Sequence, residues 1–304
     1  GEKMTLQQLR QVLTIAESNS MNEAAKKLFV SQPNLSATVR EVEEELGITV
    51  FMRNNRGITV TAEGEEFLGY AKQVVEQYHL LENRYLNVES KKKFSVSMQH
   101  YSFAVKAFVQ LAKEVGMDEY EFAVHETKTK EVIDNVKNLK SEIGVLYLSD
   151  FNEKVLRKLF KECDIEFKEL FTCNTYVYLW KKHPLAGQKE ITLDDLQEYP
   201  CLTFEQGVNN SFYYAEEMMS TYEYKRVIKA DDRATMLNLM VGLNGFTLCS
   251  GIISEDLNGD DYAAIPLKES EKMHIGYIKH KGTKLSKLGE IYIDALKNYE
   301  NKVL

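Results

Sequence analysis

The sequence predicts a protein of mixed α/β class in three parts: a small helical domain with a two-stranded ribbon, one long helix, and a larger α/β domain. A chain of 304 residues is long enough for two or three domains. Apolar residues recur at helical spacing before about residue 90, whereas strand-like segments alternate with helices after residue 93. A run of three lysines at residues 91–93 marks this change, so we place a boundary near residue 90.

Composition argues against several classes of protein. The chain has 38 basic (Lys, Arg) and 46 acidic (Asp, Glu) residues, a formal charge of −8, and 44% hydrophobic residues. These values are typical of a globular protein, not of a disordered tail or a strongly basic chromatin protein. No run approaches the roughly 18 consecutive apolar residues that a membrane span needs, and the N-terminus lacks a secretion signal. We therefore expect a cytoplasmic protein that does not associate with a membrane.

The first 47 residues predict three short helices. Leucines recur at helical spacing in the first helix. Ser20 and Glu23 fit a capping box at the start of the second. The third is expected to begin at Ser31, with Pro33 in its first turn, and to end at Gly47.

A ribbon and a long helix follow. Two strand-like segments, at residues 50–52 and 58–60, flank a polar tip, and a helix is expected from Thr61 to about residue 87. Its apolar residues alternate in steps of four and three, which is the period of a coiled-coil seam. We expect these residues to form a dimer contact: Phe67, Ala71, Val74, Tyr78, Leu81 and Tyr85. The alternative is a stripe that packs within the core of its own chain.

A short helix, a tight turn and a longer helix with a polar start form the arrangement by which helix-turn-helix proteins read duplex DNA. Small and amide side chains at that start can reach base edges in the major groove. The candidate DNA-binding residues are Met21, Asn22, Ser31, Gln32, Pro33, Asn34, Ser36, Thr38 and Arg40. Arg53 and Arg56 on the ribbon tip would contact the flanking backbone or the minor groove. The net negative charge does not oppose this prediction, because affinity depends on the local face presented to phosphate.

Two motifs resemble those of the LysR-type transcriptional regulators. The first is Ala24-Ala25-x-x-Leu28-x-Val30-Ser31-Gln32-Pro33-x-Leu35-Ser36, followed by Glu43-Glu44-Glu45-Leu46-Gly47. The second is Phe51-x-Arg53-x-x-Arg56-Gly57-x-x-Val60-Thr61-x-x-Gly64. The chain departs from the family pattern at Val50, where leucine is usual, and at Ala37-Thr38, where long polar side chains are common. The second departure means that no specific operator sequence can be transferred.

The resemblance implies a winged helix-turn-helix domain at residues 4–60, a linker and dimerisation helix at 61–90, and an effector-binding domain at 94–304. That last domain would have two lobes of the periplasmic-binding-protein type, lobe I at 94–168 and 267–304 and lobe II at 169–266. The implied partners are a pseudo-palindromic site on double-stranded DNA, further copies of the chain in a homodimer or homotetramer, and RNA polymerase. A small organic effector would bind between the lobes, and no cofactor or metal is expected.

The C-terminal pattern supports an α/β domain. We expect strands at 94–98, 120–125, 143–147, 165–171, 176–180, 201–204, 225–229, 246–249 and 274–278. We expect helices at 102–115, 131–139, 151–160, 211–222, 232–243 and 285–299. Such alternation predicts mainly parallel sheets.

A cleft between lobes offers hydrogen bonds from strand ends and helix N-termini, which suits carboxylates and other anions. The candidate effector-binding residues at such positions are Gln99, His100, Tyr101, Ser102, Thr127, Lys128, Thr129, Phe204, Asn209, Asn210 and Ser211. Lys128 or His100 would meet an anion, whereas Glu205 would oppose one unless an amine is also present.

The sequence lacks catalytic motifs: it has no glycine-rich phosphate loop, no paired-histidine zinc helix and no nucleophile elbow. The six histidines show no tight pairing with cysteines or carboxylates in the sequence. We expect Cys201 and Cys249 to be buried in strands, with redox sensing as the alternative. Two other functions remain open: a stand-alone solute-binding module, which would leave the first 90 residues unexplained, and an α/β enzyme with a helical dimerisation domain. We predict a ligand-controlled transcription factor, not an enzyme.

Overall fold

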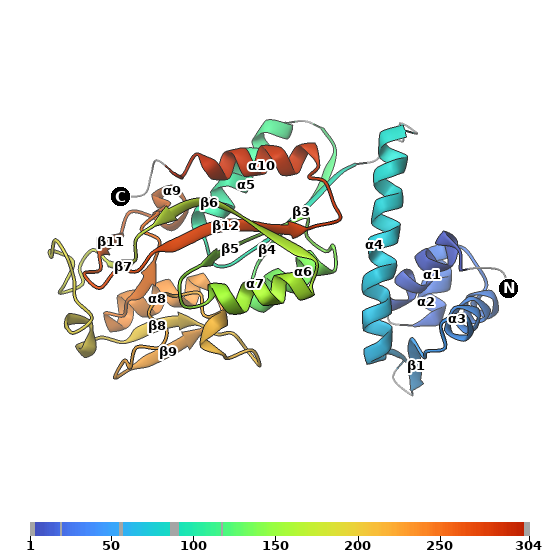
Figure 1. The fold of residues 1–304 in the computed structure, drawn as a ribbon, viewed down its shortest axis with the longest axis horizontal. Coiled ribbons are helices and arrows are strands. Elements are labelled where there is room, and N and C mark those ends of the chain that lie inside the picture. The colour runs from blue at the N-terminus through green and yellow to red at the C-terminus, as the bar shows by residue number, and fades with distance from the viewer. Residues whose placement is uncertain (1–3, 19, 55–56, 86–90, 117, 301–304) are drawn as a thin grey trace. The chain divides into compact units, whose positions relative to one another are not determined.

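The structure is a computed structural model, and it describes residues 4–18, 20–54, 57–85, 91–116 and 118–300. The chain divides into two compact units, residues 1–90 and residues 91–304. The first unit contains α1 (Leu6–Ala16), α2 (Met21–Leu28), α3 (Gln32–Leu46), β1 (Phe51–Asn54), β2 (Gly57–Val60) and α4 (Ala62–Tyr85) (Figure 1). These are the elements that the sequence predicts for residues 4–90.

The predicted caps set the helix boundaries in this unit. The Ser20 side chain accepts a hydrogen bond from the backbone N–H of Glu23 at 3.2 Å, at the start of α2. Ser31 accepts from the N–H of Asn34 at 3.3 Å, at the start of α3. Gly47 ends α3 with φ of 69°, a left-handed conformation that glycine adopts without strain.

The three short helices enclose one hydrophobic core. Its buried residues are Val12, Ile15, Met21, Ala24, Ala25, Leu35, Val39 and Val42. Fully burying a Val, Leu or Ile side chain contributes about 1.5–3 kcal/mol to stability. This small core therefore holds α3 in a fixed position against α1 and α2. The small side chains of Ala24 and Ala25 lie inside this core.

The ribbon leads directly into α4. β1 and β2 pair antiparallel, and the tip residues 55 and 56 lie outside the described residues. The Thr61 hydroxyl accepts from the N–H of Gly64 at 2.9 Å and so caps α4. A Cβ atom on Gly64 would collide with the carbonyl oxygen of Val50, so only glycine permits this close approach.

The second unit begins with alternating strands and helices. They are β3 (Lys92–Met98), α5 (Ser102–Val115), β4 (Tyr120–Glu126), α6 (Thr129–Lys137), β5 (Ile143–Leu148), α7 (Glu153–Glu162) and β6 (Ile165–Cys173). The second lobe contains β7 (Tyr176–Trp180), β8 (Cys201–Phe204), β9 (Val227–Ala230), α8 (Arg233–Leu243), β10 (Thr247–Cys249), α9 (Glu255–Asn258) and β11 (Tyr262–Pro266), with short 3-10 turns at Asp195–Glu198 and Phe212–Tyr214. The chain then returns to the first lobe through β12 (Met273–His280) and α10 (Lys287–Lys297).

The sheets are mixed, so the prediction of mainly parallel sheets is wrong. In the five-stranded sheet β4-β3-β5-β12-β6, β3 is parallel to both neighbours, but β12 is antiparallel to β5 and β6. β6 carries the chain out to the second lobe and β12 brings it back, so the two strands run in opposite directions. In the second lobe, β10-β7-β11 is antiparallel and β8-β9 is parallel. The predicted lobe crossings near 169 and 266 fall within β6 and at the end of β11.

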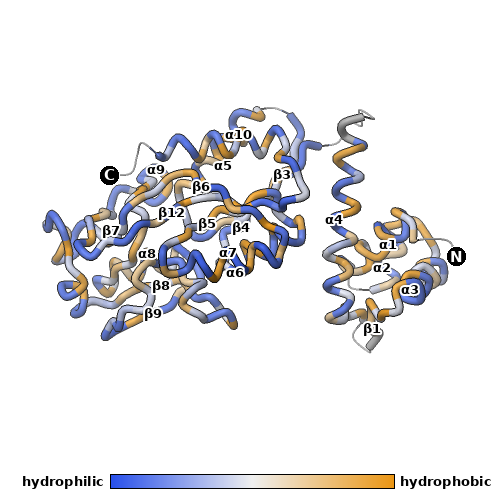
Figure 2. Tube along the Cα trace, in the orientation of Figure 1, coloured by the Kyte–Doolittle hydropathy of each residue, from blue (hydrophilic) through white to orange (hydrophobic). Residues whose placement is uncertain are grey.

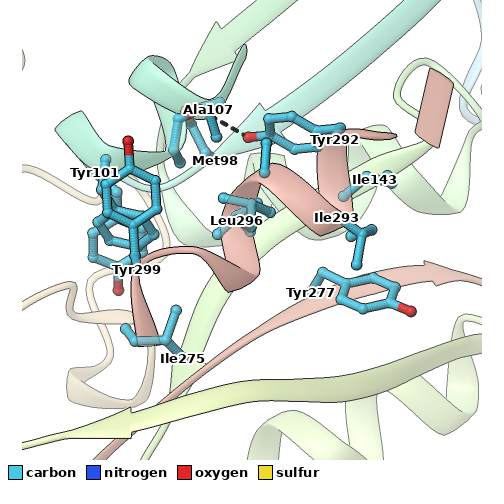
Figure 3. Close-up of a cluster of buried hydrophobic side chains, with 14 of the residues drawn as sticks. Met98, Tyr101, Ala107, Ile143, Ile275, Tyr277, Tyr292, Ile293, Leu296 and Tyr299 are labelled. Atoms are coloured by element: carbon cyan, nitrogen blue, oxygen red, sulfur yellow. Dashed lines mark hydrogen bonds between the residues drawn. The ribbon is translucent and has the colours of Figure 1, made fainter. Parts of the chain in front are cut away.

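Helices cover both faces of the five-stranded sheet. α5 and α10 lie on one face, and α6 and α7 lie on the other (Figure 1). Figure 3 shows Tyr292, Ile293 and Leu296 of α10 packed into the hydrophobic core on the face of the sheet that α5 and α10 cover. Tyr292 is fully buried, and its hydroxyl donates to the carbonyl oxygen of Ala104 at 3.1 Å, which satisfies its one buried polar atom.

One helix that the sequence predicts does not form. Residues 211–222 were expected to be helical, but only the 3-10 turn at Phe212–Tyr214 forms there, followed by bends and turns. The buried carboxylates of Glu216 and Glu217 bond to other parts of this unit, to the backbone N–H groups of His100 and Phe204. These tertiary contacts hold the segment open and override its local helical preference.

Candidate functional site

The start of α3 presents polar side chains on one exposed face. Ser31, Pro33, Asn34 and Arg40 are exposed, and Gln32, Ser36 and Thr38 are half-buried. The Gln32 amide donates to the Ser36 hydroxyl at 2.9 Å, so these two side chains form one hydrogen-bonding edge. Leu35, Val39 and Val42 point the other way, into the core. A helix fixed on one side and polar on the other is what insertion into a major groove requires.

Other predicted DNA-binding residues lie elsewhere. Asn22 is exposed, but Met21 is only 8% exposed and belongs to the core, so we no longer count Met21 among the DNA-binding residues. An apolar side chain at the first position of α2 is more stable in the core than in contact with water. Arg53 lies in β1 with its side chain outside the described part of the structure, and Arg56 lies outside it altogether.

Sequence reasoning missed Phe29, in the turn between α2 and α3. Its side chain is 95% exposed, and its backbone has φ of 55°, in the left-handed region. Asparagine or glycine would adopt this conformation with less strain. A large aromatic ring kept in water at a strained position beside the start of α3 is a candidate contact residue. An aromatic residue within a tight turn is the signal that could have identified it.

The predicted stripe on α4 divides into two parts. Phe67 and Ala71 pack inward, and Ala71 lies with Val75 in a cluster that includes Leu9 of α1. Val74, Tyr78 and Leu81 are instead exposed, by 50%, 38% and 53%. The alternative of a core stripe therefore holds for the first two residues only. Tyr85 belongs to α4, but its side chain lies outside those described.

The exposed part of the stripe continues along α4. Tyr70, four residues before Val74, is also exposed, by 60%, and Figure 2 shows the apolar residues along this helix. The Arg10 guanidinium lies 5.1 Å from the centre of the Tyr78 ring and pairs with Glu82 at 3.3 Å. We refer to Tyr70, Val74, Tyr78 and Leu81 as the α4 stripe; Leu80 is 48% exposed but lies on another side of the helix.

A cavity that is partly open to solvent lies in the second unit, where strand ends of the two lobes meet. Of the predicted effector-binding residues, it brings together His100, Tyr101, Ser102 and Phe204. Residues that were not predicted complete its polar lining: Tyr178, Glu216, Glu217, Arg233, Thr247, Ser250 and Asn258. Much of the remaining wall is apolar, from Met236, Leu237, Met240, Leu248, Ile252 and Ile253. We call this cavity the cleft pocket.

The other predicted effector-binding residues do not line the cleft pocket. Gln99 is buried, and its amide donates to the Thr129 hydroxyl at 2.6 Å. Thr127 bonds to Glu131, and Lys128 pairs with Asp231 at 3.4 Å. The remaining predicted residues, Asn209, Asn210 and Ser211, lie in a loop at the surface.

A carboxylate from the same chain lies against His100, two residues before α5 begins. One oxygen of Glu216 accepts from the backbone N–H of His100 at 2.9 Å and lies 2.8 Å from the His100 Nδ1. The other oxygen accepts from the Gln206 amide at 2.8 Å. The His100 and Glu216 side chains are only 6% and 4% exposed, and the His100 ring stacks on Phe204 at 3.6 Å. The sequence impression that no histidine pairs with a carboxylate is therefore wrong.

The N-terminus of α6 is closed by the same segment. The backbone N–H of Thr129 donates to the Gln206 side-chain oxygen at 3.1 Å, and the Thr129 hydroxyl donates to the carbonyl oxygen of Tyr214 at 2.7 Å. Residues 206–216 thus occupy the N–H of Thr129 at the start of α6 and the N–H of His100 just before α5. The amide of Gln206 and the carboxylate of Glu216, at the two ends of this segment, were the available signal.

Glu217 lies beside this network but without a cation. Glu217 lines the cleft pocket and is 5% exposed, and its carboxylate accepts from the backbone N–H of Phe204 at 2.8 Å. Burial, followed by the nearby charge of Glu216, raises the pKa of Glu217 to about 8. Among the described residues, no ion pair includes Glu217, whereas Arg233 pairs with Glu126 at 2.5 Å.

The four cysteines are free thiols, and Cys201 and Cys249 lie in β8 and β10 as expected. Burial raises the pKa of both thiols, to about 12 for Cys249, so neither is a thiolate at neutral pH. Among the described residues no group of His, Cys, Asp and Glu could hold a metal ion. The helices in the described ranges also include none that is long and apolar enough to cross a membrane.

Two family comparisons cover most of the chain. Residues 6–65 match the "Bacterial regulatory helix-turn-helix protein, lysR family", and residues 117–300 match the "LysR substrate binding domain". The chain belongs to the LysR family of transcriptional regulators. Its members are DNA-binding regulators with an effector-binding domain, not enzymes. The predicted family, fold class and function are therefore confirmed, and neither a stand-alone solute-binding module nor an enzyme fits.

Individual LysR-family proteins resemble the chain over much of its length. CysL of Bacillus subtilis (strain 168) is 26% identical over 309 aligned positions, which cover 97% of this chain and 98% of CysL. The dual regulator GltC of the same organism is 30% identical over 214 positions, which cover 67% of this chain and 66% of GltC. A full-length OxyR variant from Pseudomonas aeruginosa shares the fold with a TM-score of 0.72, at 19% identity and with coverage of 98% and 96%. CbnR, also of the LysR family, has a TM-score of 0.59 at 17% identity, with coverage of 97% and 99%.

Proposed function

We propose that this LysR-family regulator reads a pseudo-palindromic DNA site with one α3 helix from each of two chains, and that a small molecule in the cleft pocket modulates this binding. The observation that carries the proposal is the start of α3, where polar side chains are exposed on one face and the opposite face is packed in the core. Two such helices, about one helical turn of DNA apart, would contact successive major grooves.

Roles within the DNA interface follow from the chemistry of each side chain. Gln32 and Asn34 can hydrogen-bond to base edges, and Ser31 and Ser36 can contact bases or phosphates. Arg40 is exposed on the same helix and would neutralise phosphate. Arg53 and Arg56 would contact the flanking backbone from the ribbon. Thr38 and Pro33 would add close packing along the groove.

We propose that the α4 stripe forms the dimer contact. Three of its residues, Val74, Tyr78 and Leu81, keep the coiled-coil spacing and remain exposed. Tyr85 would extend the same contact by one turn. Pairing of the effector-binding domains would assemble two dimers into a tetramer, and RNA polymerase would be contacted by the assembly on DNA. We place this activity in the cytoplasm, because the regulator must reach promoter DNA there.

Control by the effector requires that the ligand distinguish two arrangements of the lobes. The cleft pocket is lined from both lobes, so a bound molecule would stabilise one lobe arrangement over another. A changed arrangement would alter the spacing of the two α3 helices within the oligomer. Ligand and DNA would then change each other's affinity by the same factor.

The DNA interface can be tested by fluorescence anisotropy with the full-length protein and duplexes from its own upstream region, at several salt concentrations. Gln32→Ala should reduce the preference for the specific duplex over a scrambled duplex, because a base contact is lost. Arg53→Ala should weaken binding to both duplexes and reduce the salt slope by about one. Lys158→Ala, at an exposed position on α7, is the matched control that removes one charge elsewhere. If Gln32→Ala and Arg53→Ala both bind like the wild type and like Lys158→Ala, the proposed surface is wrong.

A further inference from the structure

We propose that the cleft pocket binds a small organic cation, an apolar molecule that carries one ammonium group, and not an organic acid. This inference rests on the proposed role of the pocket as the effector site and names the chemistry of its ligand. Four features of the second unit support it: occupied backbone N–H groups near the helix starts, a balance of charge that opposes acids, a buried carboxylate without a cation, and a buried hydroxyl without a partner.

The first feature is the set of backbone N–H groups near helix starts that are already occupied. An organic acid in this cleft would be expected to bind backbone N–H groups at a helix start, where the helix dipole favours negative charge. Gln206 accepts from the N–H of Thr129, the first residue of α6, at 3.1 Å. Glu216 accepts from the N–H of His100, two residues before α5 begins, at 2.9 Å. An anion would have to displace Gln206 at α6, and at α5 it would lie beside the Glu216 carboxylate.

The second feature is the charge of the pocket wall. Among the described residues that line it, Glu216 and Glu217 are the acids, and Arg233 is the one Lys or Arg residue. Arg233 pairs with Glu126 at 2.5 Å, and His100 is held by Glu216. A carboxylate ligand would enter beside two acidic side chains with no cation free to receive it. Like charges at short range in a poorly solvated site disfavour such a complex.

The third feature is the environment of Glu217. Glu216 is the charged group that raises the pKa of Glu217, and the groups whose pKa the Glu217 charge raises in turn are also acids: Tyr101, Tyr147, Cys201 and Tyr224. None of them can neutralise a negative charge, and burial holds the pKa of Glu217 at about 8. An ammonium group placed against this carboxylate would supply the missing charge. Glu217 would then release its proton to solvent, while the ammonium keeps its own.

The fourth feature is the Thr247 hydroxyl. Thr247 is 6% exposed, lines the cleft pocket, and its Oγ1 has no hydrogen-bond partner among the described residues. It pairs with Tyr178 across β10 and β7, while the neighbouring pair Leu248 and Val177 packs in the core on the other face of that sheet. A hydroxyl buried without a partner loses its hydrogen bonds to water without replacement, and an ammonium N–H would satisfy it.

The rest of the pocket suits the hydrocarbon part of such a ligand. Met236, Leu237 and Met240 of α8 line one wall, with Ile252 nearby along the chain from β10. Methionine side chains adapt to ligands of different shape. Polar groups at Glu217 and Thr247 together with the apolar wall of the same pocket match an alkyl or arylalkyl amine.

The test uses isothermal titration calorimetry of the full-length protein with three matched skeletons: ethyl, butyl and 2-phenylethyl, each as the amine, the alcohol and the carboxylate. We expect the amines to bind more tightly than the alcohols, and the carboxylates not to bind. Because only the ionised form of Glu217 accepts the cation, amine affinity should rise roughly 25-fold from pH 6.5 to pH 8.5. Alkylamines resemble the lysine side chain, with a pKa of about 10.4, and stay protonated at both values.

Two variants separate the ligand's charge from the fold. Glu217→Gln should abolish the pH dependence and the preference for amines while alcohol binding persists. Thr247→Val should weaken amine binding several-fold at every pH. Glu223→Gln, an exposed acid in the same segment, is the matched control and should bind as the wild type does. If Glu217→Gln does not fold, the wild type still tests the proposal. Amine binding should release a proton, which titrations in buffers of different ionisation enthalpy detect, and binding without proton release would contradict the role of Glu217.

The outcomes distinguish the ligand class from the role of the pocket. Tighter binding of the carboxylates, lost in Thr247→Val, would overturn the cation proposal but leave the cleft pocket as the effector site. Equal binding of amines and alcohols at both pH values would do the same. If none of the nine compounds binds, both the cation proposal and the assignment of this pocket are overturned.

Discussion

The substitution Glu217→Gln should reduce the loss of stability that the second unit undergoes as the pH rises from 5 to 8. In the wild type, burial raises the pKa of Glu217 from 4.5 to about 8. A carboxyl group whose pKa is raised on folding stabilises the protein fully below its unfolded pKa, and this contribution is lost as the pH rises through the folded pKa. Between these limits the native state holds a proton that the unfolded state has released, so the free energy of unfolding falls by up to about 1.4 kcal/mol per pH unit.

The magnitude follows from this window. From pH 5 to pH 8 the wild type should lose about 3 kcal/mol of stability through this one group. Glutamine keeps an oxygen that can accept from the N–H of Phe204, and it cannot ionise. The variant should therefore match the wild type near pH 5 and exceed it at pH 8. A difference of this size corresponds to roughly 6–12 °C in melting temperature for a domain of about 200 residues.

The assay can use the single tryptophan of the chain. Trp180 lies in β7 and donates to the Asn244 side chain at 2.9 Å, so its fluorescence reports on the second lobe. Urea unfolding followed at Trp180 from pH 5 to pH 8.5 gives the slope for each protein. Glu223→Gln removes an exposed carboxylate nearby and should leave the wild-type slope unchanged. A Glu217→Gln slope equal to that of the wild type would refute the argument that Glu217 is buried and protonated.

Three further substitutions test packing, assembly and backbone strain. In Gly276→Ala the new Cβ atom would collide with the Phe167 ring, so urea unfolding should show a free energy of unfolding lower by about 1–3 kcal/mol. Gly187 has open space around it, so Gly187→Ala should stay within about 0.5 kcal/mol of the wild type. Equal losses in the two variants would contradict this prediction. Val74→Glu should dissociate the dimer in sedimentation equilibrium, whereas Leu80→Glu adds the same charge at an exposed position on another side of α4 and should not; a dimer that survives the first substitution is not formed by the α4 stripe. Phe29→Asn should raise the stability of the first unit by about 1 kcal/mol in thermal unfolding and weaken DNA binding; a lower melting temperature would show that the left-handed backbone is not strained.

The parts of the fold that the sequence predicts correctly depend on local signals. Ser20, Ser31 and Gly47 cap helices through atoms within four residues, so their roles can be read without the rest of the chain. The spacing of apolar residues likewise identifies the helices of the first unit and most strands of the second. The exposed polar start of α3 follows from the same periodicity.

The errors come from long-range contacts. Residues 211–222 were expected to form a helix, but the Glu216 carboxylate bonds to His100, 116 positions earlier in the chain. The direction of β12 depends on where the chain returns from the second lobe. The polar residues of the cleft pocket come from β7, α8, β10 and the segment around Glu217, which no spacing rule brings together. A strand-end rule finds His100 and Phe204, but not the side chains that face them.

The central claim is that α3 enters the major groove of DNA. Methylation interference with the full-length protein, on a duplex from its own upstream region, tests this claim most directly. The account predicts that methylation at guanine N7, in the major groove, blocks binding in two patches about one helical turn apart, and that Gln32→Ala loses part of this pattern. Interference confined to the minor groove, or a pattern that Gln32→Ala and Asn34→Ala leave unchanged, would contradict it.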